Sequence, residues 1–166
     1  MNILKQLTLA DGITLAGAAA GFFSILTSVS KQFSAAAMLM LAAVVLDWAD
    51  GRVARWQKKQ HAFGRELDSL ADGVSFGVAP VVFGYEHAGT VALLVAGLFF
   101  LLCGIARLAR FNITKHHSVF EGVPITTNGV VVPLAYWLGA PNVVYAGLFV
   151  VMGLLMVSSV AIKKWR

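Results

Sequence analysis

Charged residues are scarce in this sequence, making up 13% of its 166 residues, against about a quarter in a typical soluble domain. Hydrophobic residues make up 58%, which is more apolar sequence than one soluble core of this length could hide from water. The single cysteine, Cys103, leaves no partner for an intrachain disulfide. The net charge of +5 comes without a basic surface interleaved with aromatic residues, so it does not indicate nucleic-acid binding.

Repeats and low-complexity linkers are also missing, which favours a single domain over residues 1–166. The apolar sequence falls into six segments, and most are somewhat shorter than the ~20 residues that cross a bilayer. We therefore expect the helices to extend into their flanks. The sequence predicts an all-α integral membrane protein with six transmembrane helices, over about 12–29, 33–47, 73–85, 90–105, 124–138 and 143–162.

Basic residues are unevenly distributed between the two sides that six spans would create. We expect the first apolar stretch to be a retained helix rather than a signal peptide, because no small-residue cleavage site follows it. With both termini in the cytoplasm, only Lys31 of the 13 basic residues lies outside, as the positive-inside rule predicts. The inner residues are Lys5, Arg52, Arg55, Lys58, Lys59, Arg65, Arg107, Arg110, Lys115, Lys163, Lys164 and Arg166.

The one charged stretch, residues 47–72, carries four aspartates between apolar segments. Acidic residues are costly at the edge of a bilayer, so a cluster of four indicates a functional site. Asp47 and Asp50 are three residues apart and Asp68 and Asp72 are four apart, so each pair lies on one helix face. We expect the residues between them to form a hairpin that brings the two pairs together at the cytoplasmic surface.

Four converging carboxylates repel one another unless cations neutralise them. Hard oxygen ligands select Mg²⁺, Mn²⁺ or Ca²⁺, and phosphates commonly supply the remaining ligands. Two such ions could clamp a pyrophosphate and stabilise charge on its attacking and leaving oxygens. The pattern therefore predicts a metal-dependent site for a nucleotide-activated substrate.

Small residues and an arginine stand between the acidic pairs. Gly51, Ala54 and Gly64 carry little or no side chain, so a base or ribose could approach the backbone there. Arg55 can make a two-pronged contact with a phosphate. The alternative is that the small residues only pack helices and the basic residues only anchor the inner interface; we apply it to Lys58 and Lys59, since an anchor does not need four carboxylates.

These positions form the pattern D-x2-D-G-x2-A-R-x8-G-x3-D-x3-D, which resembles the signature of the CDP-alcohol phosphotransferases at all eight places. The resemblance implies a membrane enzyme, typically with six core helices, that transfers a phosphatidyl-type group from a CDP-linked lipid to an alcohol and releases CMP. It implies that Asp47, Asp50 and Asp68 bind Mg²⁺ or Mn²⁺, two ions per site, and that Asp72 joins the metal site and acts as general base. It also implies a nucleotide site, formed by Asp47, Gly51, Ala54, Arg55, Gly64 and Asp68, with Arg55 on the donor phosphate.

Two further runs, 66–80 and 103–112, look like the phosphatidylserine synthase branch of that family, whose acceptor is L-serine. Arg107 and Arg110 lie three apart and could receive a serine carboxylate or a lipid phosphate; alternatively, they are interface anchors. That branch usually carries a Gly-Leu-Pro motif next, whereas this chain reads Gly-Val-Pro at residues 122–124. The lipid could accordingly be CDP-diacylglycerol or an archaeal CDP-archaeol.

Other interpretations stay open at this point. Within the family, the acceptor could be glycerol phosphate, an inositol phosphate or another small alcohol. A divalent-cation channel or transporter could also gather carboxylates, although a transporter should hold them near the midplane in repeated halves. We expect His61, His116 and His117 to be solvated loop residues. The small residues of the first segment would suit close helix packing, including the contact of a homodimer.

Overall fold

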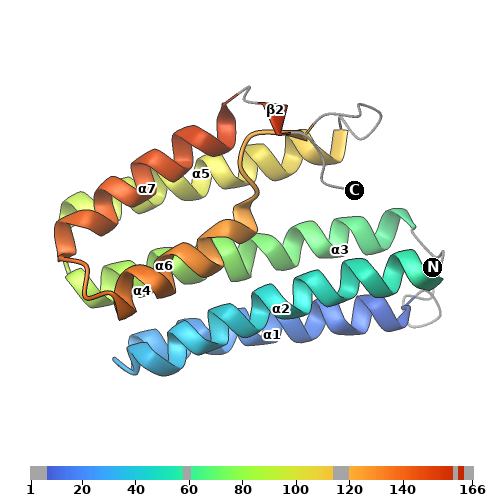
Figure 1. Cartoon of the computed structure of the whole chain (residues 1–166), viewed down its shortest axis with the longest axis horizontal. Helices are drawn as coiled ribbons and strands as arrows, with labels where there is room; N and C mark the ends of the chain where they lie inside the picture. The colour runs from blue at the N-terminus through green and yellow to red at the C-terminus, as the bar shows by residue number, and fades with distance from the viewer. Residues whose placement is uncertain (1–6, 58–60, 114–119, 159–160, 163–166) are drawn as a thin grey trace.

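The structure is a computed structural model, which describes residues 7–57, 61–113, 120–158 and 161–162. Within these residues it is a helical bundle with one pair of two-residue strands (Figure 1). The strands β1 (Phe120–Glu121) and β2 (Ala161–Ile162) pair antiparallel. The α-helices are α1 (Leu9–Val29), α2 (Phe33–Gln57), α3 (Ala62–Asp72), α4 (Ala79–Ala88), α5 (Val91–Ile113), α6 (Asn128–Trp137) and α7 (Asn142–Val157).

Four helical stretches of the described chain are long and apolar enough to cross a membrane. The predicted membrane-helical character is confirmed, and the first four helical stretches extend beyond one or both predicted ends of their apolar segments. The predicted fifth segment, 124–138, is instead too long, because residues 125–127 form a 3₁₀ turn and α6 covers only Asn128–Trp137. The second segment, predicted to end near residue 47, continues as α2 to residue 57, and the third begins at residue 62 rather than 73. Both differences arise because the charged residues of the motif are themselves helical. The four stretches are Leu9–Val29, Phe33–Gln57, Ala62–Ala88 and Val91–Ile113.

The predicted sixth segment, 143–162, is too long. Helix α7 ends at Val157, and Ser158 has extended backbone angles (φ −63°, ψ 156°). The guanidinium of Arg110 donates to the carbonyls of Met156 and Ser158 at 3.2 and 3.3 Å, so it satisfies carbonyl groups that a helix end leaves without partners. The chain then pairs through β2 with β1 instead of continuing as a helix.

Small residues allow the helices that carry the site to approach closely. Helix α1 packs along α2 and also contacts the helical stretch that follows α3. A Cβ on Gly21 would meet Ser75, and the Ser75 hydroxyl donates to the Gly17 carbonyl at 3.2 Å. Between α1 and α2, the Ser24 hydroxyl donates to the Ala36 carbonyl at 2.9 Å. Hydroxyl and backbone groups thus fix α1 against both neighbours.

A π-helical segment, η2 (Gly73–Val78), joins α3 to α4, so the three form one continuous helical stretch. Pro80 follows it inside α4 and has no N–H to offer to the preceding turn. The widened hydrogen-bond pattern is seen at Ala79, whose N–H bonds the Val74 carbonyl five residues back. This segment follows directly on Asp72, so a local departure from α-helical geometry lies next to the motif's last acid.

The second half of the bundle is formed by α5 and α7, with α6 packed on α2. A short 3₁₀ turn, η3 (Ile125–Thr127), leads into α6. Buried aromatic side chains, including Phe76, Phe83, Phe100 and Phe149, make the core between the halves. The Ser69 hydroxyl donates to Asn112 at 3.1 Å, which joins α3 to the end of α5 beside the motif.

Charged groups of the described residues gather at the end of the bundle where α2 finishes and α3 begins (Figure 1). At the opposite end, the Lys31 ammonium pairs with the Glu86 carboxylate at 2.6 Å, across the turns that follow α1 and α4. The two ends of the bundle therefore differ in how many charged residues they carry.

Candidate active site

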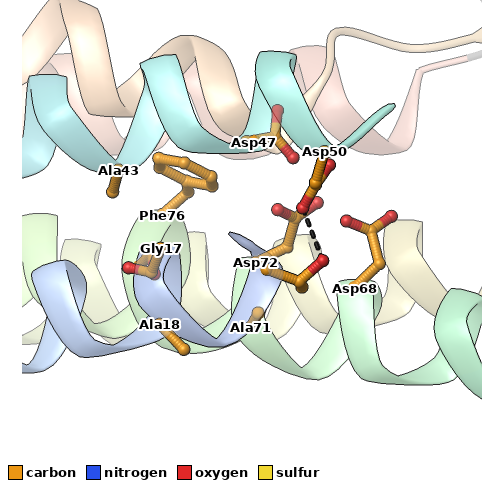
Figure 2. Close-up of a pocket in the computed structure, with 11 residues that line it drawn as sticks. Gly17, Ala18, Ala43, Asp47, Asp50, Asp68, Ala71, Asp72 and Phe76 are labelled. Carbon is orange, nitrogen blue, oxygen red and sulfur yellow. Dashed lines mark hydrogen bonds between the residues drawn. The ribbon is translucent and has the colours of Figure 1, made fainter. Parts of the chain in front are cut away.

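Four carboxyl groups converge between α2 and α3. Figure 2 shows Asp47 and Asp50 pointing from α2 toward Asp68 and Asp72 on α3. Ligand oxygens of Asp47, Asp50 and Asp68 lie within 4.8 Å of one another. The hairpin predicted from the three- and four-residue spacings is therefore present, and it brings both pairs to one place.

This group of oxygens fits a hard divalent cation. Carboxylates this close repel one another in a partly buried site, and a Mg²⁺ or Mn²⁺ ion with oxygen ligands removes that repulsion. Three carboxylates from two helices also leave coordination positions for phosphate oxygens. Asp72 lies beside this trio, but its oxygens are not among those within 4.8 Å of one another.

Asp50 is fixed by a residue outside the motif. It is buried, and the hydroxyl of Thr14 on α1 donates to its Oδ2 at 2.6 Å (dashed line in Figure 2). Thr14 is buried as well, and its hydroxyl oxygen lies 3.1 Å from the Ala10 carbonyl, the longer of the two contacts that share its one proton. No local pattern indicates this contact, because it joins residues 36 apart and threonine is common in apolar helices.

Asp72 lies between an acid and a base. Its carboxyl group lies close to that of Asp47, and both interact electrostatically with the guanidinium of Arg107. Asp72 thus lies at the cluster's edge, where the acids meet a buried positive charge.

The two arginines singled out on α5 have different surroundings. Arg107 is 8% exposed, interacts with Asp72 and Asp47, and lies over the Phe111 ring at 5.2 Å. Arg110 instead donates to carbonyls at the end of α7, as described above. The structure places Arg107 beside the acids. Arg110 has a structural role, because it contacts the end of α7.

A cavity of about 290 Å³ opens beside the acids. Its volume approaches the lower bound of about 300 Å³ for small-molecule sites. Asp47 and Asp72 line a smaller pocket that adjoins it through Asp50 and Asp68. The larger cavity is lined by six of the eight motif residues: Asp50, Gly51, Ala54, Arg55, Gly64 and Asp68.

Two other residues that line the larger cavity, Asp11 and His61, were not assigned to the site from the sequence. Asp11 is 3% exposed, and its carboxylate lies 3.2 Å from Nε2 of His61. His61 lies in the connection before α3, as predicted, and its side chain is 32% exposed, but its ring is not simply solvated, since both nitrogens have partners. The spacing Thr8-x-x-Asp11 is a capping-box signal that could have located the start of α1, but not this contact. His116 and His117 lie outside the described residues.

Comparison with known proteins agrees with this geometry. The family described as CDP-alcohol phosphatidyltransferase matches residues 7–165. The chain belongs to this family. The CDP-alcohol phosphatidyltransferase match thus covers the described helices and every residue of the acid cluster, so the resemblance carried by 26 residues extends over nearly the whole chain.

Several relatives in the family are named for serine. The chain is 37% identical over 165 residues to the archaetidylserine synthase of Methanothermobacter thermautotrophicus, covering 96% of this chain and 71% of the relative. It is 39% identical over 155 residues to the CDP-diacylglycerol–serine O-phosphatidyltransferase of Saccharomyces cerevisiae, covering 81% and 56%. The protein of that name from Methanocaldococcus jannaschii is 34% identical over 164 residues, covering 99% and 78%.

Proposed function

We propose that this protein transfers a phosphatidyl-type group from a CDP-linked lipid to the hydroxyl of L-serine and releases CMP. The observation that carries the donor half of the proposal is the junction of the acid cluster with the 290 Å³ cavity. Serine as acceptor is supported by the relatives that are named for it. A nucleoside diphosphate needs both features side by side: oxygen ligands for its metal-bound phosphates, and room for its base and ribose.

The donor half of the site uses motif residues in distinct ways. We assign Asp47, Asp50 and Asp68 to a divalent cation, Mg²⁺ or Mn²⁺, and two ions to each site with Asp72 contributing. Such an ion, when bound, supplies positive charge to the phosphate oxygens. Gly51, Ala54 and Gly64 leave space for the nucleoside, and Arg55, which lines the same cavity, holds a donor phosphate.

The acceptor half centres on Asp72 and Arg107. Asp72 takes the proton of the serine hydroxyl, whose oxygen then forms a bond to the phosphorus that carries the lipid. The bond from that phosphorus to the CMP oxygen breaks, and its electron pair leaves with CMP. Arg107, held near Asp72, receives the serine carboxylate through its planar guanidinium. Arg110, the other arginine predicted as an acceptor or phosphate contact, borders Arg107 but donates to carbonyls at the end of α7, so we assign the serine carboxylate to Arg107.

We further propose six transmembrane spans, with α6 and α7 as the fifth and sixth, and both termini and the active site facing the cytoplasm of a cell membrane. The gathering of the described basic residues of α2, α3 and α5 at the end that carries the acids supports this orientation. The lipid tails then remain in the inner leaflet while the CDP group enters the cavity. We also propose that the protein forms a homodimer, as predicted from the small residues of α1.

The acceptor is tested with purified protein, Mg²⁺ or Mn²⁺, and either CDP-diacylglycerol or CDP-archaeol. We expect CMP release with L-serine, and a serine-containing lipid product, at rates well above those with glycerol phosphate or inositol phosphate. Chelation of the metal should abolish release. CMP release with a different alcohol but not with serine would support the family's reaction and identify that alcohol as the acceptor. The absence of release with every alcohol, together with divalent-cation flux into vesicles, would favour a channel.

A further inference from the structure

The ring of His61 joins the starts of two helices. Its Nδ1 accepts a hydrogen bond from the N–H of Gly64 at 2.9 Å, which caps the first turn of α3. Since Nδ1 accepts, the other nitrogen carries the proton, and Nε2 lies 3.2 Å from Oδ2 of Asp11 near the start of α1. One side chain thus makes a cap within α3 and a bridge to α1.

Asp11 is a rigid anchor for that bridge. Its Oδ2 accepts hydrogen bonds from the N–H and hydroxyl of Thr8 at 2.7 and 2.8 Å, and Thr8 Oγ1 accepts from the Asp11 N–H in return. The residue is 3% exposed, so its carboxylate has little water to replace a lost partner. The position of His61 is therefore determined by α1 as well as by its own helix.

The bridge determines how closely Gly64 approaches α1. A Cβ on Gly64 would lie 2.6 Å from Oδ1 of Asp11 and 3.1 Å from Cε1 of His61. A side chain at Gly64 would therefore push against the Asp11–His61 pair as well as reduce the cavity that Gly64 lines. Asp68 follows one turn later on the same helix, so the same contact sets the place of a metal-binding carboxylate.

We propose that His61 is a positioning residue for the donor nucleotide, acting through its bridge to Asp11. By holding the first turn of α3 against α1, it fixes Gly64 and Asp68 as two walls of the 290 Å³ cavity, which His61 and Asp11 also line. The inference rests on the proposed function, and it adds two residues that lie outside the eight-residue signature.

A capping role alone would not require histidine. Serine caps a helix as well or better, but its side chain is too short to cap α3 and reach Asp11 together. The variant His61→Ser therefore keeps the cap and removes the bridge. Asp11→Asn is the conservative partner, because a carboxamide oxygen still accepts hydrogen bonds from His61 and Thr8.

The test measures kcat, the KM for CDP-lipid and the KM for serine, alongside equilibrium binding of CDP with Mg²⁺ and the thermal midpoint. For His61→Ser we expect about a tenfold loss of CDP binding and a similar rise in the KM for CDP-lipid, in line with the loss of a hydrogen bond to a charged group. The KM for serine should stay within about twofold, and Asp11→Asn should remain within about threefold of wild type in CDP binding.

The inference would be overturned if His61→Ser bound CDP as tightly as the wild type. It would also be overturned if kcat, both KM values and CDP binding all worsened together, in proportion to a lower thermal midpoint. The CDP measurement also separates the inference from the reaction. Wild-type protein that binds CDP but releases no CMP with any alcohol would refute the proposed function, whereas the effect of His61→Ser on CDP binding would still decide the role of His61.

Discussion

At the scale of single residues, the two arginines of α5 show how similar side chains acquire different tasks. Arg107 is buried against the acids and Phe111, whereas Arg110 reaches the carbonyl groups at the end of α7. Positive charge at the inner interface is common to both. The contacts of Arg107 with the acids connect it to the proposed chemistry, whereas the hydrogen bonds of Arg110 reach the end of α7, so the two positions form a matched pair for experiment.

Replacing Arg107 by lysine should weaken serine recognition. Arg107→Lys keeps the positive charge beside Asp72 but loses the planar pair of donors that suits a carboxylate. We expect the KM for serine to rise about tenfold or more, with CDP binding within about threefold of wild type, because one charge-assisted hydrogen bond is lost. Steady-state kinetics at varied serine, together with CDP titration, measures both.

Arg110→Lys is the control for that experiment. Its wild-type contacts are with helix-terminal carbonyls, so the variant should lower the thermal midpoint while leaving the KM for serine near wild type. If Arg110→Lys raised the KM for serine and Arg107→Lys did not, the assignment of the two arginines would be reversed.

At the scale of helices, α1 packs closely against the π-helical segment that follows Asp72. Gly21 lies against Ser75, and a Cβ there would come within 2.7 Å of the Ser75 Cα. A backbone atom cannot swing aside as the tip of a long side chain can. This contact should therefore tolerate no added volume, although it lies outside the catalytic cluster.

Gly21→Ala should destabilise the protein by about 1–3 kcal/mol, the usual cost of overpacking. Gly12→Ala is the matched control on the same helix, because a Cβ there meets nothing within 4 Å. The control should be neutral or stabilising by up to about 1 kcal/mol, since alanine is the better helix former. Thermal unfolding in detergent measures both, and equal effects of the two variants would contradict the packing described here.

The elements also show what sequence can and cannot predict. The apolar segments and the three- and four-residue spacings of the aspartates predicted the hairpin, because both are local patterns. The start of α3 was missed because its charged residues carry no apolar run, although they are helical. The contacts Thr14–Asp50 and Asp11–His61 were missed because each joins residues distant in sequence, and no local pattern specifies which distant partner a side chain meets.

At the scale of the whole molecule, the asymmetry of charge between the ends of the bundle bears on orientation. The described basic residues of α2, α3 and α5 lie at the end that carries the acids, and the Lys31–Glu86 pair lies at the other. Substrates that are charged and water-soluble, such as serine, must reach the first end from the compartment that supplies them. The proposed orientation places that end in the cytoplasm.

Cysteine labelling tests this orientation directly. Cys103 is buried, and Cys103→Ala gives a background without thiols. In that background, Ser30→Cys should react with an impermeant maleimide in intact cells, whereas Ala62→Cys should react only after permeabilisation. Both wild-type side chains are exposed. The opposite pattern would place the active site outside the cell, and release of CMP by both variants would show that each remains folded.

The central claim is that the acid cluster between α2 and α3 carries out the transfer, with Asp72 as the base. Asp72→Asn keeps the shape of the side chain and removes its capacity to accept the serine proton. With CDP-lipid, Mg²⁺ or Mn²⁺ and serine, we predict that CMP release falls at least about a hundredfold, while CDP binding stays within a few-fold of wild type. CMP release at the wild-type rate would contradict the account.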